Sequence, residues 1–180
     1  MNYGRFNLIL GPMYSGKTSE LLRRLNRYKI AKKKCLLIKF DEDNRYDDEY
    51  VCTHDQVKHK AVKCNKLEKV NNIITNYDVI CIDEVQFYSD SSIYCDKWAN
   101  DGKIVEACGL NGDFNKKPFE QITKLIPQVD DLIFLKAVDK NTGQDAPFTF
   151  RLSNNKEQKV IGGLDIYSAV SRTSYIRNFV

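Results

Sequence analysis

The stretch Phe6-Asn-Leu-Ile-Leu-Gly-Pro-Met-Tyr-Ser-Gly-Lys-Thr18 decides the fold class of this chain. Its first five residues form a short apolar run that predicts a buried strand. The rest fits the pattern G-x(4)-G-K-[ST], in which glycines let successive backbone N–H groups point at phosphate oxygens. We therefore expect a phosphate loop at the end of a strand. Its expected nucleotide-binding residues are Gly11, Pro12, Met13, Tyr14, Ser15, Gly16, Lys17 and Thr18.

Two residues of this loop carry specific expectations. The Lys17 ammonium is expected to reach the β- and γ-phosphates, and the Thr18 hydroxyl to ligand Mg²⁺. A helix that begins directly after the loop adds its positive N-terminal end to an anion site. The pattern of apolar residues in Thr18–Lys34 predicts such a helix, with a basic outer face.

Further apolar runs extend this unit into a sheet. Residues 35–40 predict a strand parallel to the first, because strand, loop, helix and strand form a βαβ unit. More strands are expected at 77–82, 103–110 and 132–138, and a short helix at 92–100. This alternation predicts an α/β fold of the P-loop NTPase (RecA-like) type with a mostly parallel sheet.

The character of the sequence changes at Asp139. Polar turn residues are followed by 148–152, an Asn154-Asn155 turn and 159–161, which predicts a hairpin. We therefore expect two units, a nucleotide-binding α/β unit over 1–138 and a small hairpin unit over 139–180.

The composition limits which classes of function are possible for this chain. The chain has 180 residues, of which 42% are hydrophobic and 29% charged, so it is expected to fold as an ordinary globular protein. No apolar run is long enough to suggest a membrane span, and no secretory signal is apparent. Six cysteines without a C-x-x-C pair favour reduced thiols in a cytoplasmic setting. A net charge of +4 is too mild to predict nucleic-acid binding.

Asp83 and Glu84 close the strand expected at 77–82. A carboxylate at the end of a buried strand suits a second Mg²⁺-organising group, which we assign to Asp83. Strand alternation would turn Glu84 elsewhere, where it can serve as a general base. The alternatives are a helix N-cap or a surface charge. These parts alone also suit an ATPase in which Glu84 activates water.

Several blocks along the chain resemble the type II thymidine kinases, cellular and viral. They occur in the order typical of that family, over residues 6–175. The blocks are 11–24, 43–46, 53–55, 83–88, 109–114, 117–119 and 161–163, followed by Tyr167. The resemblance implies ATP-dependent phosphorylation of the thymidine 5′-hydroxyl, which gives dTMP and ADP in nucleotide salvage.

The resemblance also implies roles for individual residues. Glu84 resembles the general base, and Arg45 the arginine that stabilises the transferring phosphoryl group; Lys17 completes the catalytic set. Thr18 and Asp83 resemble the pair that organises Mg²⁺. The implied thymidine-binding residues are Met13, Phe87, Leu110, Phe114, Phe119, Phe148, Thr149, Val160, Ile161, Gly162, Gly163 and Tyr167. Phe148 and Thr149 open a segment that resembles the substrate lasso of the family, so the resemblance implies that 139–180 is a lasso domain. For Phe87, Phe114 and Phe119, plain core packing is the alternative.

One part of the resemblance fails. The family has a structural zinc site built from two C-x-x-C pairs, and the matching positions here are Asp139, Thr142, Ser171 and Ser174. Oxygen ligands of this kind hold Zn²⁺ poorly, so we predict no zinc there. We expect the hairpin, Pro147, a cluster of Phe148, Phe150 and Tyr175, or subunit contacts to hold the small domain instead.

A second group of metal-binding residue types lies elsewhere. Cys52, His54, His59 and Cys64 are of types that suit zinc, but their spacing matches no common structural pattern.

Two other interpretations stay open at this point. One is a RecA-like ATPase or nucleic-acid-binding module. The other is a kinase scaffold whose small domain, without zinc, no longer orders its lasso. The resemblance further implies a homotetramer, inhibition by dTTP, and the cytoplasm, that of the host if the protein is viral.

Overall fold

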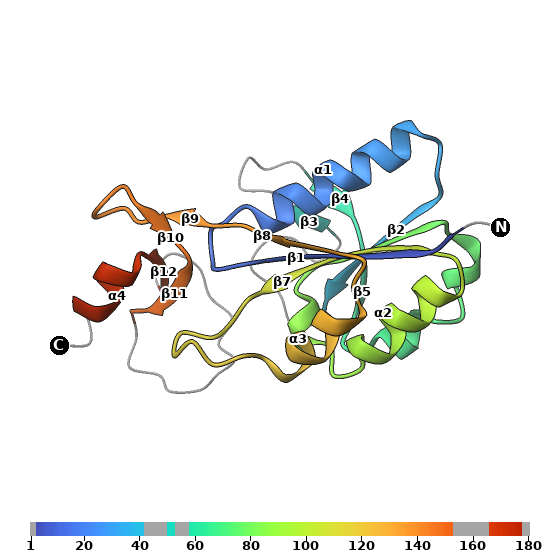
Figure 1. Cartoon of the computed structure of the whole chain (residues 1–180). Helices are drawn as coiled ribbons and strands as arrows, with labels where there is room; N and C mark the ends of the chain where they lie inside the picture. The colour runs from blue at the N-terminus through green and yellow to red at the C-terminus, as the bar shows by residue number, and fades with distance from the viewer. Residues whose placement is uncertain (1–2, 42–49, 53–57, 153–165, 178–180) are drawn as a thin grey trace.

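The computed structural model describes residues 3–41, 50–52, 58–152 and 166–177 of the chain. Its centre is a sheet of six parallel strands in the order β5-β2-β6-β7-β1-β8 (Figure 1). The strands are β1 (Arg5–Gly11), β2 (Cys35–Phe40), β5 (Val62–Cys64), β6 (Val79–Ile82), β7 (Ile104–Leu110) and β8 (Asp131–Phe134). The predicted α/β class with a mostly parallel sheet is confirmed.

Helices cover both faces of this sheet. The long helix α1 (Lys17–Ile30) lies on one face, and α2 (Ser91–Asn100) and α3 (Glu120–Leu125) lie on the other (Figure 1). Short 3-10 turns occupy Leu67–Val70, Ile74–Asn76, Val85–Phe87 and Ile126–Gln128, and a small hairpin pairs β3 (Tyr50–Cys52) with β4 (Lys58–Lys60). Among the described residues, no helix has the length and apolar character needed to cross a membrane.

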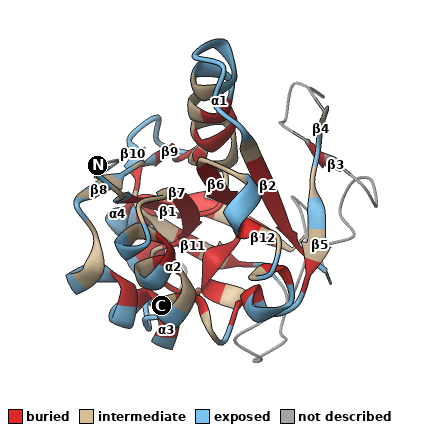
Figure 2. Cartoon of the chain, turned by 90° about the vertical axis from the view of Figure 1, so that its right-hand side faces the viewer, coloured by how far each residue is buried: buried red, intermediate tan, exposed pale blue. Residues whose placement is uncertain are grey.

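The apolar strand residues explain this layering. On the α1 side, Leu21, Leu22 and Leu25 pack against strand residues such as Ile9 and Cys81. On the other side, a larger cluster joins strand residues to Trp98 of α2 and to α3. Figure 2 shows the resulting distribution, with buried residues on the central strands and exposed ones along the outer side of α1. Both faces are buried, as a parallel sheet requires.

A buried polar network ties α1 to the sheet. The Glu106 carboxylate on β7, 1% exposed, accepts hydrogen bonds from Asn7 Nδ2 (2.7 Å), Tyr28 Oη (2.7 Å) and Arg24 Nη1 (2.8 Å). Burial, and then the hydrogen bond to Glu106, raises the pKa of Tyr28. A buried carboxylate with this many donors fixes how α1 sits over β1 and β7.

One expectation about the strands needs correction, and another is confirmed. The run 132–138 is not one strand: β8 ends at Phe134, and β9 (Ala137–Val138) pairs with β10 (Asp145–Ala146). The strands of the predicted βαβ unit, β1 and β2, are parallel, but β6 and β7 lie between them. The end of β8 and the order of the strands both depend on pairing between distant segments, which local periodicity does not report.

Of the hairpin expected at 148–161, the structure describes only the first strand. The strand β11 (Phe148–Arg151) pairs antiparallel with β12 (Tyr167–Val170). The expected second strand at 159–161 lies outside the described residues. We call β9, β10, β11, β12 and the following helix α4 (Arg172–Arg177) the C-terminal module. It lies beyond the end of the sheet at which β1 finishes (Figure 1).

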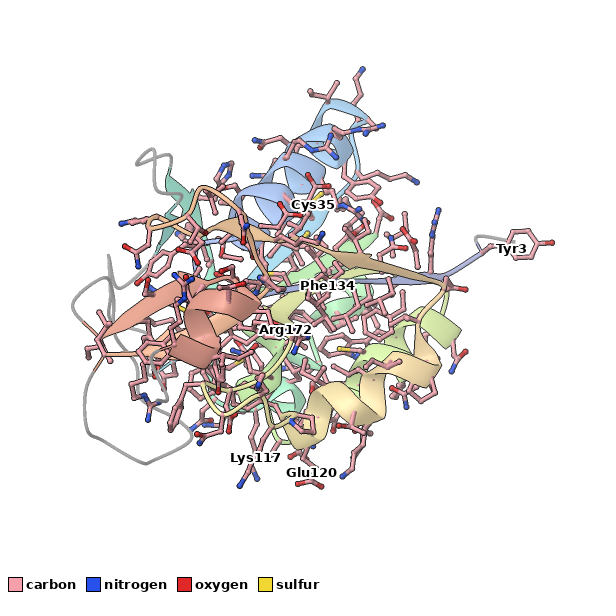
Figure 3. The ribbon with its side chains drawn as sticks, turned by 60° about the vertical axis from the view of Figure 1, so that its left-hand side comes forward. Tyr3, Cys35, Lys117, Glu120, Phe134 and Arg172 are labelled. Carbon is pink, nitrogen blue, oxygen red and sulfur yellow. The ribbon has the colours of Figure 1, made fainter. Side chains whose placement is uncertain are left out.

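Aromatic and cationic side chains hold α4 against β11. The ring centres of Phe148 and Tyr175 lie 5.6 Å apart, and those of Phe150 and Tyr175 6.1 Å apart. Arg172, labelled in Figure 3, places its guanidinium 4.8 Å from the centre of the Phe148 ring. Lys116 brings its ammonium to 4.1 Å from the centre of the Tyr175 ring. The attraction between exposed cations and the faces of these aromatic rings stabilises the packing of the module.

The Asp139 carboxylate forms a second anchor within the module. Asp139 is 1% exposed, and it accepts hydrogen bonds from the backbone N–H groups of Ser171 (2.8 Å) and Asn141 (2.9 Å). The Ser171 and Ser174 hydroxyls lie 3.3 Å apart. Hydrogen bonding from the Ser174 side chain, together with the Ser171 and Asn141 bonds, holds the pKa of Asp139 below its usual value. The ionised carboxylate therefore joins the turn after β9 to the start of α4.

We predict that Asp139→Asn destabilises the protein. The amide keeps one acceptor but turns an N–H₂ group toward a backbone donor, and a hydrogen bond to a charged group contributes about 1.5–3 kcal/mol. We expect the midpoint of thermal unfolding at pH 7 to fall by roughly 3–10 °C. The control is Asp145→Asn, because Asp145 pairs with Lys136 on the exposed surface and such pairs contribute little.

The pH dependence of this difference gives a second check. Because the folded-state pKa of Asp139 is lowered, its contribution is full above the unfolded pKa of about 3.9 and is lost as the pH falls below it. The gap in melting temperature between wild type and Asp139→Asn should narrow toward about pH 3. An Asp139→Asn protein as stable as wild type at pH 7 would contradict this account.

Candidate active site

The loop Gly11–Thr18 joins the end of β1 to the start of α1. A Cβ on Gly11 would lie 2.5 Å from the Leu135 carbonyl oxygen and from Ser15 Oγ, so only glycine fits there. Gly16 has φ +82°, a conformation that other residues rarely adopt. The Lys17 ammonium, 8% exposed, donates to the Pro12 carbonyl at 2.7 Å. The loop thus has the tight turns and inward-held lysine of a phosphate cradle.

Asp83 lies where the carboxyl end of β6 meets this loop. Its Oδ1 accepts a hydrogen bond from Thr18 Oγ1 at 3.1 Å. The strand β7 lies between β1 and β6. The hydrogen bond from Thr18 to Asp83 therefore connects two chain segments that are one strand apart in the sheet. A hydroxyl and a carboxylate oxygen side by side are oxygen donors of the kind that Mg²⁺ prefers, with phosphate and water completing its shell.

Cys108 supports the same carboxylate from β7, and sequence reasoning missed it. Its thiol donates to Asp83 Oδ1 at 2.9 Å. Burial, followed by the nearby Asp83 charge, raises the pKa of Cys108 well above its usual value. The group therefore stays a protonated donor. The sequence places Cys108 near the end of an expected strand. Only the strand order shows that this strand lies between β1 and β6, which brings Cys108 to Asp83.

The position of Glu84 depends on its backbone conformation and on a hydrogen bond from the Gln86 side chain. The strand β6 ends at Ile82, so strand alternation does not determine the direction of Glu84, contrary to our expectation. Instead Glu84 has φ 53° and ψ 46°, a left-handed conformation that is uncommon outside glycine. Its carboxylate is 8% exposed, and its Oε2 accepts a hydrogen bond from Gln86 Nε2 at 2.7 Å. Strained backbone of this kind often accompanies functional residues.

An apolar cluster lies beside the loop and the acidic pair. The Phe87 and Phe119 rings meet edge to face, with their centres 6.0 Å apart. The expected thymidine-pocket residues that belong to this one cluster are Met13, Phe87, Leu110, Phe119 and Tyr167. The cluster is part of the main core, so core packing and a ligand surface are both consistent with these contacts.

Phe114 joins this group through Arg151, which sequence reasoning also missed. The buried Arg151 guanidinium lies 3.9 Å from the centre of the Phe114 ring and donates to the Tyr167 hydroxyl at 2.6 Å. The Tyr175 hydroxyl of α4 donates to the Phe114 carbonyl at 2.7 Å. The C-terminal module therefore holds Phe114 and Tyr167 together.

Thr149 connects the C-terminal module to the phosphate loop. The Met13 N–H donates to Thr149 Oγ1 at 3.0 Å, and Thr149 is buried. Its neighbour Phe148 packs instead against Tyr175 and Arg172, within the module. Of the two residues expected to open the lasso, one thus touches the loop and the other stabilises the module.

Some expected site residues lie outside the described residues. These are Arg45, Val160, Ile161, Gly162 and Gly163, and also His54 of the second cysteine and histidine group. In the described part of the chain, no group of three or more His, Cys, Asp or Glu side chains is arranged to hold a metal ion.

Comparisons with known proteins match the sequence of this chain to a family. The family model described as "Thymidine kinase" matches residues 4–175. Thymidine kinases of variola virus and of vaccinia virus (strain Western Reserve) are each 44% identical over 176 residues, covering 98% of this chain and 99% of the relative. That of rabbit fibroma virus is 41% identical over 172 residues, with 96% of each chain covered. This chain therefore belongs to the thymidine kinase family.

Proposed function

We propose that the protein transfers the γ-phosphoryl group of ATP to the 5′-hydroxyl of thymidine, giving dTMP and ADP. Membership of the thymidine kinase family supports thymidine as the substrate. The observation that carries the chemistry is the meeting of the phosphate loop, Asp83 and Glu84 at one end of the sheet, where Thr18 Oγ1 and Asp83 Oδ1 lie 3.1 Å apart. The apolar cluster with Phe87 and Phe119 adjoins this point and suits a planar base.

The loop residues Gly11–Thr18 would bind the phosphates through backbone N–H groups and the Lys17 ammonium. Thr18 and Asp83 have the donor set to hold Mg²⁺, which when bound neutralises charge on the transferring phosphate. Asp83 already has its orientation fixed, because the Cys108 thiol and the Glu84 N–H both donate to Oδ1. Such prior ordering is what electrostatic stabilisation of a transition state requires.

Glu84 would act as the general base. Its carboxylate takes the proton of the 5′-hydroxyl while that oxygen forms a bond to the γ-phosphorus, and the bond from this phosphorus to the β–γ bridging oxygen breaks, releasing ADP. Positioning and charge neutralisation supply most of the catalysis in such transfers, so a carboxylate base is sufficient. We assign stabilisation of the transferring group to Arg45, from the resemblance alone.

The base and sugar would lie between the two units that we propose, 1–138 and 139–180. The main unit contributes Met13, Phe87, Leu110, Phe114 and Phe119. The lasso domain contributes Tyr167 and Thr149, with Phe148 in support, and we assign Val160, Ile161, Gly162 and Gly163 to thymidine binding from the resemblance alone.

Thymidine-dependent formation of ADP tests the proposal, with deoxycytidine, single-stranded DNA and no acceptor as parallel reactions. We expect turnover with thymidine and none that follows DNA. Turnover that ignores thymidine but follows DNA would contradict the kinase and favour a RecA-like ATPase.

We predict that Glu84→Gln lowers kcat by about 10²–10⁴-fold, the usual contribution of a general base. Thymidine binding, measured by calorimetry, should change far less, because the amide keeps the shape of the side chain. The matched control is Glu120→Gln, since Glu120 pairs with Lys124 on the surface. Near-wild-type turnover by Glu84→Gln would refute the assignment of the base.

We propose that the lasso domain holds no structural zinc, since Asp139 and Ser171 stand at the ligand positions and are hydrogen-bonded to their own neighbours. We expect metal analysis to find less than about 0.1 zinc per chain, and chelator treatment to leave the melting temperature unchanged. Stoichiometric zinc that Asp139→Asn abolishes would overturn the proposal; zinc that Cys64→Ser abolishes would place a site in the Cys52–Cys64 group.

Three further features rest on the family resemblance, and we propose them in the same terms. The protein would assemble as a homotetramer in the cytoplasm, that of the host cell if it is viral. It would be inhibited by dTTP, bound in competition with thymidine. We propose neither nucleic acid nor membrane as a partner.

A further inference from the structure

Tyr14 of the phosphate loop packs against the C-terminal module, and this contact has no role in the account so far. The half-buried Tyr14 ring lies against three buried alanines, which we call the alanine surface: Ala137 of β9, Ala146 of β10 and Ala169 of β12. The ring also packs against the main core cluster. Figure 1 shows the module beyond the end of β1, where the phosphate loop begins. The Tyr14 ring therefore lies where the module meets the α/β unit.

The strand pairing of the module places a second contact beside the first. Ala169 lies opposite Thr149 in the pair of β11 and β12. Residues that lie opposite each other in a sheet project to the same face. Thr149 Oγ1 accepts a hydrogen bond from the Met13 N–H at 3.0 Å. Two consecutive loop residues, one through its backbone and the next through its ring, therefore contact neighbouring points of the module.

The backbone of Tyr14 indicates what these contacts do. Its φ is 63°, in the left-handed region that residues other than glycine rarely adopt. A residue keeps such a conformation only when the surrounding structure holds it there. The loop residues that follow include Lys17, and they carry the groups that would bind the phosphates. The conformation at Tyr14 therefore affects where these groups point.

We propose that Tyr14 is a positioning residue through which the C-terminal module sets the shape of the phosphate loop. Packing of its ring orders the loop before the nucleotide arrives, and the ring need not touch ATP. This inference rests on the proposed function of the loop as the ATP site. The competing explanations are a direct contact between Tyr14 and the nucleotide, and a ring that only stabilises the fold.

The test is calorimetric titration with a non-hydrolysable ATP analogue and Mg²⁺, without thymidine, beside the melting temperature of each variant. Tyr14→Ala removes the ring, and we expect the dissociation constant to rise about tenfold. That change corresponds to a loop that is competent to bind in roughly one molecule in ten. Tyr14→Phe keeps the ring and should recover most of the affinity. A Tyr14→Phe protein as weak as Tyr14→Ala would assign the effect to the hydroxyl and overturn the packing argument.

Ala146→Val distinguishes coupling to the module from a direct contact with the nucleotide. Ala146 is fully buried, and the two added methyl groups crowd the Tyr14 ring from the side of the module. We expect this change alone to raise the dissociation constant about three- to tenfold. In the Tyr14→Ala background there is no ring to displace, so the same change should raise it less than about twofold.

Tyr94→Ala is the matched control. Tyr94 is a half-buried residue of α2 that also packs against the main core cluster, with its ring centre 5.7 Å from that of Trp98. Loss of this ring should lower the melting temperature and leave the dissociation constant within about twofold of wild type.

An unchanged dissociation constant in Tyr14→Ala, or in Ala146→Val, would overturn the inference. So would effects of these two changes that multiply independently in the double variant, or a Tyr94→Ala protein weakened as much as Tyr14→Ala. If the wild type binds the analogue and phosphorylates thymidine in any of these cases, the proposed function stands and only the role of Tyr14 fails. A wild type that does not bind the analogue would refute the ATP site, and this inference with it.

Discussion

The hydrogen bond between Thr18 and Asp83 is the contact on which the rest of the site depends. It joins the start of α1 to the end of β6, across the strand β7 that lies between β1 and β6. It forms because the strands are parallel, so their carboxyl ends meet at one edge, where loops bring functional groups together. Cys108 on the intervening strand donates to the same Asp83 oxygen. The order of the strands therefore determines the geometry of the acidic pair.

We propose that the C-terminal module is held together without thiolate metal ligands. A buried carboxylate, Asp139, receives backbone donors from two separate segments, and rings from β11 and α4 pack against one another. In this proposal, ring contacts and hydrogen bonds to the ionised Asp139 take the place of the zinc site that the resemblance implies. The module touches the phosphate loop, through Thr149, and Phe114, through Arg151. We infer that order in the substrate site depends on these contacts.

Local patterns predicted much of this structure. The loop Gly11–Thr18, the helix after it and the main buried strands follow from residue spacing, because these elements depend on nearby residues. Strand order and the pairing of β11 with β12 depend on distant segments, so periodicity could not supply them. The same holds for Cys108, Arg151 and Asp139, whose partners lie 16 to 32 residues away along the chain. Tyr14 stood within the recognised loop, but its packing against the module became visible only in the fold.

We propose that Glu84, the phosphate loop and the thymidine-binding residues form one site. A crystal structure with thymidine, Mg²⁺ and a non-hydrolysable ATP analogue tests it most directly. We predict that the 5′-oxygen lies within about 3.2 Å of a Glu84 carboxylate oxygen and faces the γ-phosphorus in line with its leaving group. We also predict that the thymine ring contacts Phe87 and Tyr167. A thymidine bound elsewhere, or a 5′-oxygen that faces another side chain, would contradict the account.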